Sequence, residues 1–305
     1  MDNRRDEVVQ IARSIKDLTE ADVLIELTKL KKIDIEKLPE NSKIGSKVID
    51  YYTLHERMKV RMQKCYRTNF YEFLCQEEKF SKQHTTIKYF QYIGQEVDWK
   101  DMKKVWKLWN FYYGYSSNFN TLVGIKLLKQ YKPKIVLDPF ASWGSRLLAS
   151  YIGKADKYIG IESNLNLEKC YSEMMSLYKN FSVEMIFKNN MFIDYSTLDY
   201  DFVLTKVPYY NQELHEYQSY LSENEINENY GILFRRIFDN LKEGGYMCLN
   251  ASNKVYKSVL NCVLGSAVKY KIFKRNRKNK RVEGLDEYDE IIYIWKKEDT
   301  KKIEI

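Results

Sequence analysis

The sequence predicts an α/β fold in which a doubly wound, largely parallel sheet carries helices on both faces. Three observations lead to this prediction. Short apolar runs alternate with helical patterns from residue 116 onward. The apolar run 135–137 stops at Asp138 and passes through small residues into a helical pattern, which indicates a buried strand, a tight turn and a helix N-terminus. A second apolar run, 157–162, ends in Glu162, as strands of nucleotide-binding α/β folds do.

The same reading places the other elements along the chain. Further strands are expected at 183–187, 202–204, 246–250, near 268–273 and at 291–295. Helices are expected at 232–241 and near 255–264, whereas the polar stretch 212–228 lacks a clear period. Short strands that alternate with helices in this way fit a doubly wound sheet.

Three segments are predicted. Residues 1–64 read as a helical N-terminal extension, because apolar residues recur at helical spacing and Thr19 to Asp22 form a capping box. Residues 65–115 are an aromatic-rich linking segment that packs on the core, and 116–305 form the α/β domain. The basic faces of the extension are either solvated or in contact with DNA. The aromatic rings of 65–115 either pack in a core or stack on unpaired bases.

Composition limits the classes of protein. The formal charge is +8, from 50 Lys and Arg against 42 Asp and Glu, which fits a polyanionic partner or merely a lysine-rich proteome. The five cysteines are widely spaced and histidines number only three, so neither a metal site nor a disulfide framework is expected. The first residues are polar and no apolar run is long enough to cross a bilayer. We therefore expect an intracellular protein without a membrane partner, in a compartment that the sequence does not specify.

The turn after the first strand carries a recognisable motif. Backbone N–H groups at such a strand–turn–helix junction favour electron-rich ligand groups. Residues 138–148 read DPFASWGSRLL, which resembles the DPFAGWGGRLL motif of S-adenosylmethionine-dependent DNA amino-methyltransferases of the viral and phage type. Ser142 and Ser145 replace glycines of that motif. The resemblance covers roughly residues 65–296 and implies a class I methyltransferase, Rossmann-like fold with an antiparallel C-terminal strand.

The resemblance also implies the cofactor, S-adenosylmethionine, and the residues around it. Asn118 and Phe119, in the SNF stretch before the first strand, would contact its methionine part, although an N-cap with a buried Phe explains them equally well. Glu162 is expected to bind the ribose hydroxyls, and Asn190 lies where the family places a residue near the adenine. The full predicted set is Asn118, Phe119, Asp138, Pro139, Phe140, Ser142, Gly144, Glu162 and Asn190.

The predicted catalytic loop departs from the family pattern. The family carries D/N/S-P-P-Y/F, whose first side chain and neighbouring carbonyl accept hydrogen bonds from the amino group of a flipped base while the aromatic ring stacks on it. Here the residues are Lys206, Val207, Pro208 and Tyr209. A protonated lysine has three donors and no acceptor. If Ser142 requires a positive φ, that residue costs about 1–2 kcal/mol.

Three functions remain open from the sequence. The first is methyl transfer from S-adenosylmethionine to an exocyclic amino group in DNA, most simply on adenine. The second is a catalytically inactive nucleic-acid-binding or scaffold subunit of an active methyltransferase partner. RNA or protein methylation on the same fold is a third. Nucleic-acid contacts are expected from residues 209–230, which include Tyr210, and from a basic segment that is otherwise a solvated hairpin tip. The residues of the basic segment are Lys274, Arg275, Arg277, Lys278, Lys280 and Arg281.

Overall fold

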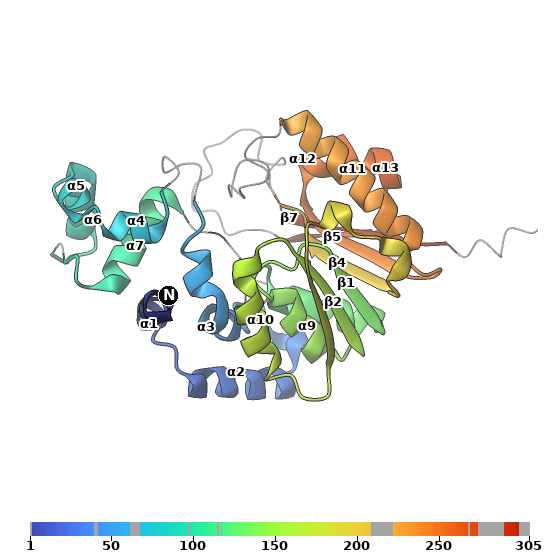
Figure 1. Cartoon of the computed structure of the whole chain (residues 1–305), viewed down its shortest axis with the longest axis horizontal. Coiled ribbons are helices and arrows are strands. Elements are labelled where there is room, and N and C mark those ends of the chain that lie inside the picture. The colour runs from blue at the N-terminus through green and yellow to red at the C-terminus, as the bar shows by residue number, and fades with distance from the viewer. Residues whose placement is uncertain are drawn as a thin grey trace, which may run out of the picture.

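The computed structural model (Figure 1) describes residues 2–39, 42–61, 68–96, 98–114, 116, 118–208, 222–267, 269–273 and 290–298. Its centre is a seven-stranded sheet in the order β3-β2-β1-β4-β5-β7-β6. The strands are β1 (Ile135–Asp138), β2 (Lys157–Glu162), β3 (Ser182–Phe187), β4 (Phe202–Lys206), β5 (Tyr246–Ser252), β6 (Lys269–Phe273) and β7 (Glu290–Lys296). β1 to β5 pair in parallel, and β7 pairs antiparallel with β5 and β6. The predicted doubly wound α/β sheet with an antiparallel strand near its C-terminal end is confirmed.

Helices cover both faces of this sheet. The helices of the α/β part are α8 (Thr121–Tyr131), α9 (Ser145–Gly153), α10 (Glu168–Met175), α11 (Glu223–Asn240), α12 (Asn253–Val255), a π-helical turn (Tyr256–Leu260) and α13 (Asn261–Leu264). Short 3₁₀ turns lie at Leu165–Leu167, Asn190–Phe192 and Tyr195–Thr197. Figure 1 shows α11 to α13 on the face of the sheet opposite to α9 and α10.

Alternate strand residues form the two cores, as the pleat of a strand requires. Val136 and Tyr158 pack with α8, α9 and α10, whereas Leu137 and Ile159 pack with α11 and the helices after β5. All four side chains are at most 1% exposed. Burial on both faces explains why these strands read as continuous apolar runs in the sequence.

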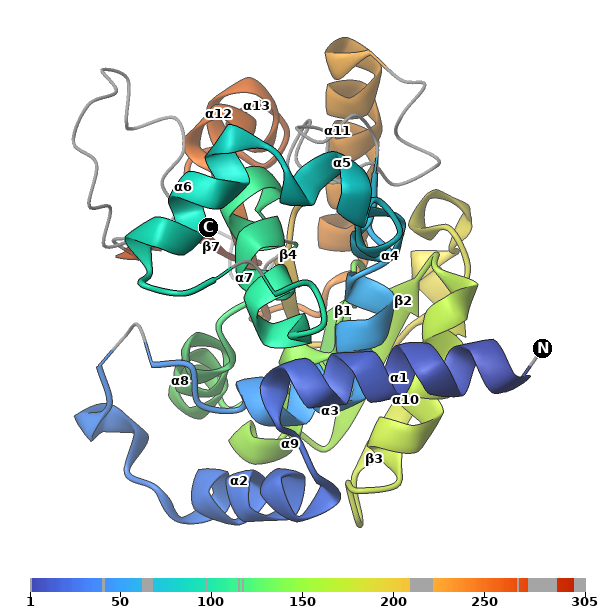
Figure 2. The same ribbon diagram turned by 90° about the vertical axis from the view of Figure 1, so that its left-hand side faces the viewer.

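The N-terminal residues contribute to the same core. They form α1 (Asp2–Lys16), α2 (Glu20–Lys32), a 3₁₀ turn (Ile35–Lys37) and α3 (Ser46–Arg57). The predicted capping box at Thr19 is present. Side chains of α2 and α3, among them Val23 and Val48, belong to the cluster that covers one face of the sheet. Figure 2 shows α1 crossing α3 on this side of the molecule.

The aromatic-rich segment forms a helical lobe of its own. Its helices are α4 (Phe70–Leu74), α5 (Glu77–Ser81), α6 (His84–Tyr92) and α7 (Met102–Tyr113), and Figure 1 shows them on the side of α3 away from the sheet. Seven of its rings are buried in one cluster with side chains of α1 and α3; they are Phe70, Phe73, Phe80, Phe90, Trp99, Trp106 and Trp109. For these rings, core packing is the correct alternative.

One boundary was predicted wrongly. The sequence placed the helix before β5 at 232–241, but α11 begins at Glu223. Ser222 and Glu225 form a capping box there, and Ile226 and Tyr230 continue the buried face toward the N-terminus. Only one apolar residue per turn lies in this part of the helix, so its period is not evident from the sequence.

Candidate functional site

The turn after β1 is built around a buried carboxylate. Asp138 is fully buried, and its Oδ2 accepts hydrogen bonds from Arg146 Nε at 2.6 Å and from the Tyr158 hydroxyl at 2.8 Å. Its Oδ1 accepts a hydrogen bond from Thr205 Oγ1 at 2.7 Å. Asp138 therefore joins β1, β2, β4 and α9 at one point, and we call Asp138, Arg146, Tyr158 and Thr205 the β1 hub.

Arg146 shapes the turn from within. Its guanidinium donates to the carbonyls of Phe140 and Ala141, and it lies 5.3 Å from the centroid of the Phe119 ring. The pKa of Tyr158 is raised well above its ordinary value, because burial removes a phenolate from water and the Asp138 carboxylate repels it. The hub thus holds the turn in one shape and brings Phe119 beside it.

The turn itself contains the left-handed residue that the motif anticipated. Ser142 has φ 55° and Gly144 has φ 89°, so the serine occupies a conformation that favours glycine. Glu162 Oε2 accepts the Ser142 N–H at 2.7 Å, and Glu162 Oε1 accepts the Asn164 N–H at 2.8 Å. The Tyr171 hydroxyl donates to the Ser142 carbonyl at 3.0 Å. These contacts compensate part of the strain.

The other predicted cofactor residues surround the same turn. Asn190 Nδ2 donates to the Pro139 carbonyl at 3.2 Å. Ser116 accepts from Trp143 Nε1 at 3.0 Å, which fixes the chain just before Asn118. The carboxyl ends of β1, β2 and β3 therefore gather Phe119, Phe140, Ser142, Glu162 and Asn190, where open α/β sheets bind ligands.

The loop after β4 begins next to this turn. Through Thr205, the end of β4 is hydrogen-bonded to Asp138. The Val207 side chain is buried, and the Val207 N–H donates to the carbonyl of Asn250 in β5 at 2.9 Å. The Pro208 carbonyl accepts the Tyr230 hydroxyl at 3.3 Å.

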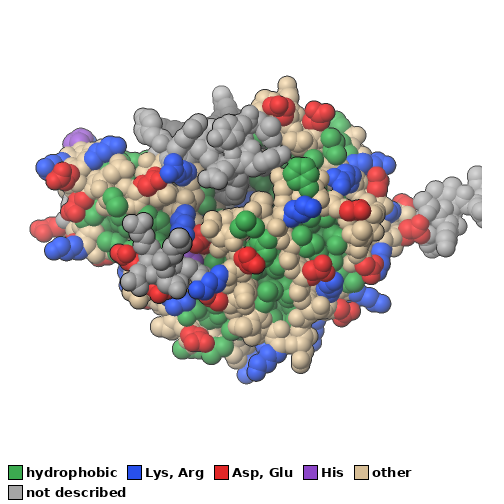
Figure 3. Space-filling view, in the orientation of Figure 1, with side chains coloured by type: hydrophobic (Ala, Val, Ile, Leu, Met, Phe, Trp, Pro, Cys, Tyr) green, Lys and Arg blue, Asp and Glu red, His purple; other side chains and the backbone are tan. Residues whose placement is uncertain are grey.

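Lys206 is the last residue of β4 and is half-buried opposite Asn250. The predicted stacking residue Tyr209 lies outside the described residues. So do the predicted nucleic-acid contacts, which are Tyr210, Lys274, Arg275, Arg277, Lys278, Lys280 and Arg281. On the face drawn in Figure 3, acidic and basic side chains of the described residues are interspersed, so they form no patch of one charge there.

Helices were expected in residues 1–64, but the sequence did not indicate that α3 lies against the turn. Thr53 Oγ1 bonds to the Ile49 carbonyl at 2.7 Å and lies 3.5 Å from the Trp143 carbonyl. Asp50 is buried and accepts from Arg57 Nη2 at 2.5 Å and from Asn118 Nδ2 at 3.5 Å. Polar residues at positions 50, 53 and 57 share one helix face, and that spacing inside a buried helix is the signal that could have revealed them.

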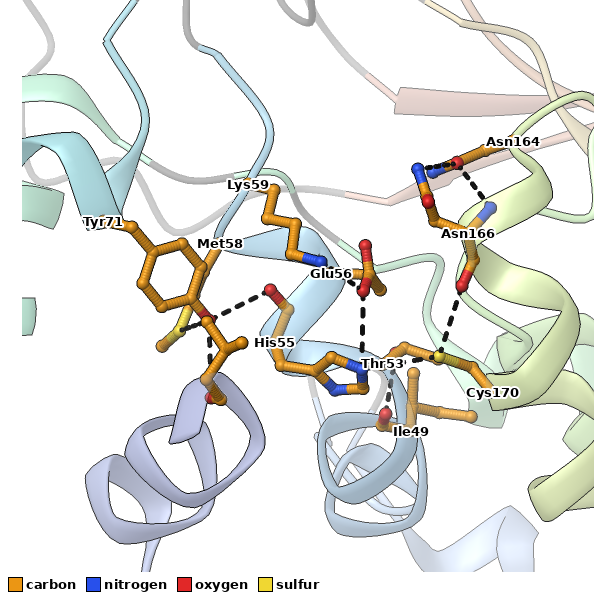
Figure 4. A network of polar contacts seen from close by, with 11 residues as sticks. Ile49, Thr53, His55, Glu56, Met58, Lys59, Tyr71, Asn164, Asn166 and Cys170 are labelled. Carbon is orange, nitrogen blue, oxygen red and sulfur yellow. Dashed lines mark hydrogen bonds and ion pairs between the residues drawn. The ribbon is translucent and has the colours of Figure 1, made fainter. Parts of the chain in front are cut away.

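Further polar contacts of α3, around His55 and Glu56, are drawn in Figure 4. Glu56 bonds to Lys59 Nζ at 2.6 Å and lies 3.6 Å from His55 Nε2. His55 Nε2 is 3.7 Å from Cys170 Sγ on α10. The network therefore connects α3 to α10, which follows β2 in the chain.

Metal and membrane features are absent from the part of the chain that the structure describes. No group of three or more His, Cys, Asp or Glu side chains could hold a metal ion there. No helix in this part is both long and apolar enough to span a membrane. None of the four cysteines within it takes part in a disulfide.

No family model matches the sequence, and no curated protein matches it. Among solved structures, the chain is similar to TrmN from Thermus thermophilus, with 12% identity and a TM-score of 0.42 over 59% of this chain and 49% of that one. It is similar to an rRNA methylase from Streptococcus thermophilus, with 13% identity and a TM-score of 0.41 over 60% of this chain and 99% of that one.

A third similar structure is the M. jannaschii tRNA m1G37 methyltransferase, with 14% identity and a TM-score of 0.41 over 60% of this chain and 51% of that one. The match therefore spans about half the length of two of these three proteins. At this level of similarity the likeness concerns the fold alone, and the fold assignment rests on the strand order and the antiparallel β7.

Proposed function

We propose that this protein is an S-adenosylmethionine-dependent methyltransferase that acts on an exocyclic amino group of a nucleic-acid base, most simply adenine in DNA. The observation that carries the proposal is the 2.7 Å hydrogen bond between Thr205 and Asp138. It joins the carboxyl ends of β4 and β1, so the cofactor-type turn and the loop that resembles a base clamp begin side by side. In-line methyl transfer requires that the cofactor and the base be bound next to each other.

The residues around the turn fit the proposed cofactor. Glu162 accepts two backbone N–H groups at the end of β2, the position from which nucleotide-binding α/β folds bind ribose hydroxyls. Phe119, which is buried, and Phe140, which is partly buried, lie beside the turn, and Asn190 is held there by the Pro139 carbonyl. The bound cofactor would supply a methyl group on a sulfonium, which needs little acid–base assistance from the protein.

The loop after β4 would position the base. Val207 and Pro208 are anchored to β5 and to Tyr230, so this part of the loop has a defined path. In the proposed arrangement the Val207 carbonyl accepts a hydrogen bond from the base amino group, and Tyr209 stacks on the flipped base. Nucleic acid would be the partner, because a flipped base would be the substrate and the basic segment 274–281 would bind phosphates.

A second function has support from two particular residues. Lys206 stands where the amino-methyltransferase pattern has an acceptor, and its ammonium group would repel a sulfonium. Ser142 holds a left-handed conformation in the turn, which adds a hydroxymethyl group where the family has none. Both changes favour an inactive, nucleic-acid-binding or scaffold subunit that works with an active methyltransferase partner.

Calorimetry and a transfer assay separate the two functions. The proposed enzyme binds S-adenosylmethionine and transfers labelled methyl groups to DNA that contains adenine; absence of binding at millimolar cofactor would exclude it. Binding without transfer to any DNA or RNA identifies the subunit. RNA of the same base content tests the choice of nucleic acid.

The variants Lys206→Asp and Ser142→Gly sharpen the assay. If the double variant gains DNA methylation that the native chain lacks, the native chain is a decayed enzyme. If the native chain methylates DNA and Lys206→Asp abolishes it, the lysine itself takes part. The matched control is Lys188→Asp, which makes the same charge change just after β3 rather than at the end of β4.

A further inference from the structure

Two opposite charges lie buried on α3 beside the turn. The side chains of Asp50 and Arg57 are 9% and 5% exposed, and Asp50 Oδ1 lies 2.5 Å from Arg57 Nη2. A second cation, Lys16 of α1, lies 3.6 Å from Asp50 Oδ2. Two cations therefore surround one carboxylate, and the excess positive charge is complementary to an anionic group.

The pair is incompletely hydrogen-bonded. Arg57 Nε and Asn118 Oδ1 are buried and have no hydrogen-bond partner in the part of the chain that the structure describes. Both residues contact the same oxygen, Asp50 Oδ1. A buried polar atom without a partner costs about 1–3 kcal/mol. One orphaned donor and one orphaned acceptor, on two residues that share a partner, indicate a ligand with both an acceptor and a donor.

This patch belongs to the turn. Asn118 precedes Phe119, whose ring lies under the Arg146 guanidinium. Thr53, one helical turn before Arg57, reaches to 3.5 Å from the Trp143 carbonyl within the turn. Asp138 already accepts hydrogen bonds from Arg146, Tyr158 and Thr205. A charged ligand group that enters beside the turn would therefore meet the partly unsatisfied residues of α3.

We propose that Arg57, Asp50 and Asn118 bind the amino-acid end of S-adenosylmethionine. In this arrangement the Arg57 guanidinium donates to the α-carboxylate, while Asn118 Oδ1 and Asp50 accept from the α-ammonium. The proposal rests on the proposed function and adds a role for the N-terminal helices, which complete the cofactor site. It also explains why a charged pair is kept in a buried helix, where apolar residues would be at least as stable.

The first test varies the ligand and keeps the native chain. Calorimetry compares S-adenosylhomocysteine, its decarboxylated analogue and 5′-methylthioadenosine, which lacks the whole amino-acid end. A charged hydrogen bond to the carboxylate predicts that the decarboxylated analogue binds about 10- to 100-fold more weakly than S-adenosylhomocysteine. Equal affinity of all three would overturn the inference, because it would mean that the amino-acid end of the ligand contacts only water. The proposed function would still stand. Failure of all three to bind overturns both.

The second test varies the protein. Arg57→Met should lower the affinity for S-adenosylhomocysteine about 10- to 100-fold and leave that for 5′-methylthioadenosine unchanged. The matched control is Arg61→Met, which removes an arginine of an exposed ion pair with Glu72 and should change neither affinity. Equal weakening of both ligands by Arg57→Met would show a structural role and contradict the inference.

Asn118→Ala provides an independent variant if Arg57→Met does not fold. It removes the orphaned acceptor from a connecting segment and leaves the Asp50–Arg57 pair intact. The expected result is again a selective loss of affinity for ligands that carry the α-ammonium. If Asn118→Ala leaves the ratio of the affinities for S-adenosylhomocysteine and 5′-methylthioadenosine unchanged, Asn118 does not contact the amino-acid end and the proposed site is excluded.

Discussion

Two buried aspartate–arginine pairs lie on either side of the turn, and they differ in how completely they are bonded. Asp138 and Arg146 bond to each other, to Tyr158, to Thr205 and to two carbonyls of the turn. Asp50 and Arg57 bond to each other but leave Arg57 Nε and the neighbouring Asn118 Oδ1 without partners among the described residues. A saturated pair holds a fold together, whereas an unsaturated pair retains hydrogen-bonding capacity for a ligand.

The largest expected effect tests the saturated pair. Arg146→Met should lower the free energy of unfolding by about 3–5 kcal/mol, because it leaves the Asp138 carboxylate buried without its counter-charge. Denaturation by urea, monitored by far-ultraviolet circular dichroism, measures this loss. Bound S-adenosylhomocysteine should not restore it to the native value.

The control for that variant is Arg235→Met, which removes an exposed partner of Asp239. Such pairs contribute about 0–1 kcal/mol, so little change is expected. A loss below 1 kcal/mol in Arg146→Met would mean that the β1 hub is dispensable for folding, and the contrast between the two pairs would disappear.

A smaller effect concerns alkaline pH. The pKa of Tyr158 is raised well above its ordinary value by burial and by Asp138. Above about pH 10 the unfolded chain loses this proton while the folded chain keeps it, so the stability falls as the pH rises, by about 1.4 kcal/mol per pH unit. Urea denaturation between pH 9 and 11 should show the decline, and Tyr158→Phe should reduce its slope by that amount.

Other buried tyrosines act in the same direction. Burial also raises the pKa of Tyr171 and of Tyr178 well above the ordinary value, so part of the slope should remain in Tyr158→Phe. Stability that stays constant up to pH 11 in the native chain would contradict the proposed burial of these hydroxyls.

The smallest effect concerns the strain of the turn between the two pairs. Ser142→Gly should raise the free energy of unfolding by about 1 kcal/mol or less, because relief of the positive φ is partly offset by the greater flexibility of glycine in the unfolded chain. Thermal denaturation without ligand measures the change. The same variant should bind S-adenosylhomocysteine more tightly if the serine side chain crowds the cofactor.

The matched control is Lys154→Gly, at another left-handed residue that follows α9. It should give a similar gain in stability and leave the cofactor affinity unchanged. If both variants change the cofactor affinity equally, the effect of Ser142→Gly comes from a change in the stability of the whole domain, and not from removal of the serine side chain in the turn.

Much of the fold could be predicted because its signals are local. The apolar run before Asp138, the small residues after it and the capping box at Thr19 each depend on neighbours within a few positions. The start of α11 was missed because its buried face there has a single apolar residue per turn. From the sequence, a positive φ at Ser142 was considered as one possibility, and the structure shows that Ser142 has a positive φ.

The sequence by itself determined the strand–turn–helix core and the residues of its turn, because hydrophobic period and turn chemistry are properties of short segments. Only the tertiary structure decided that Thr205 bonds to Asp138 and that Asp50 and Arg57 lie beside Asn118. These contacts join residues more than 60 positions apart, and the partner of a buried charge depends on the packing of whole helices. Whether such a charge is saturated or open to a ligand is therefore a property of the assembled fold.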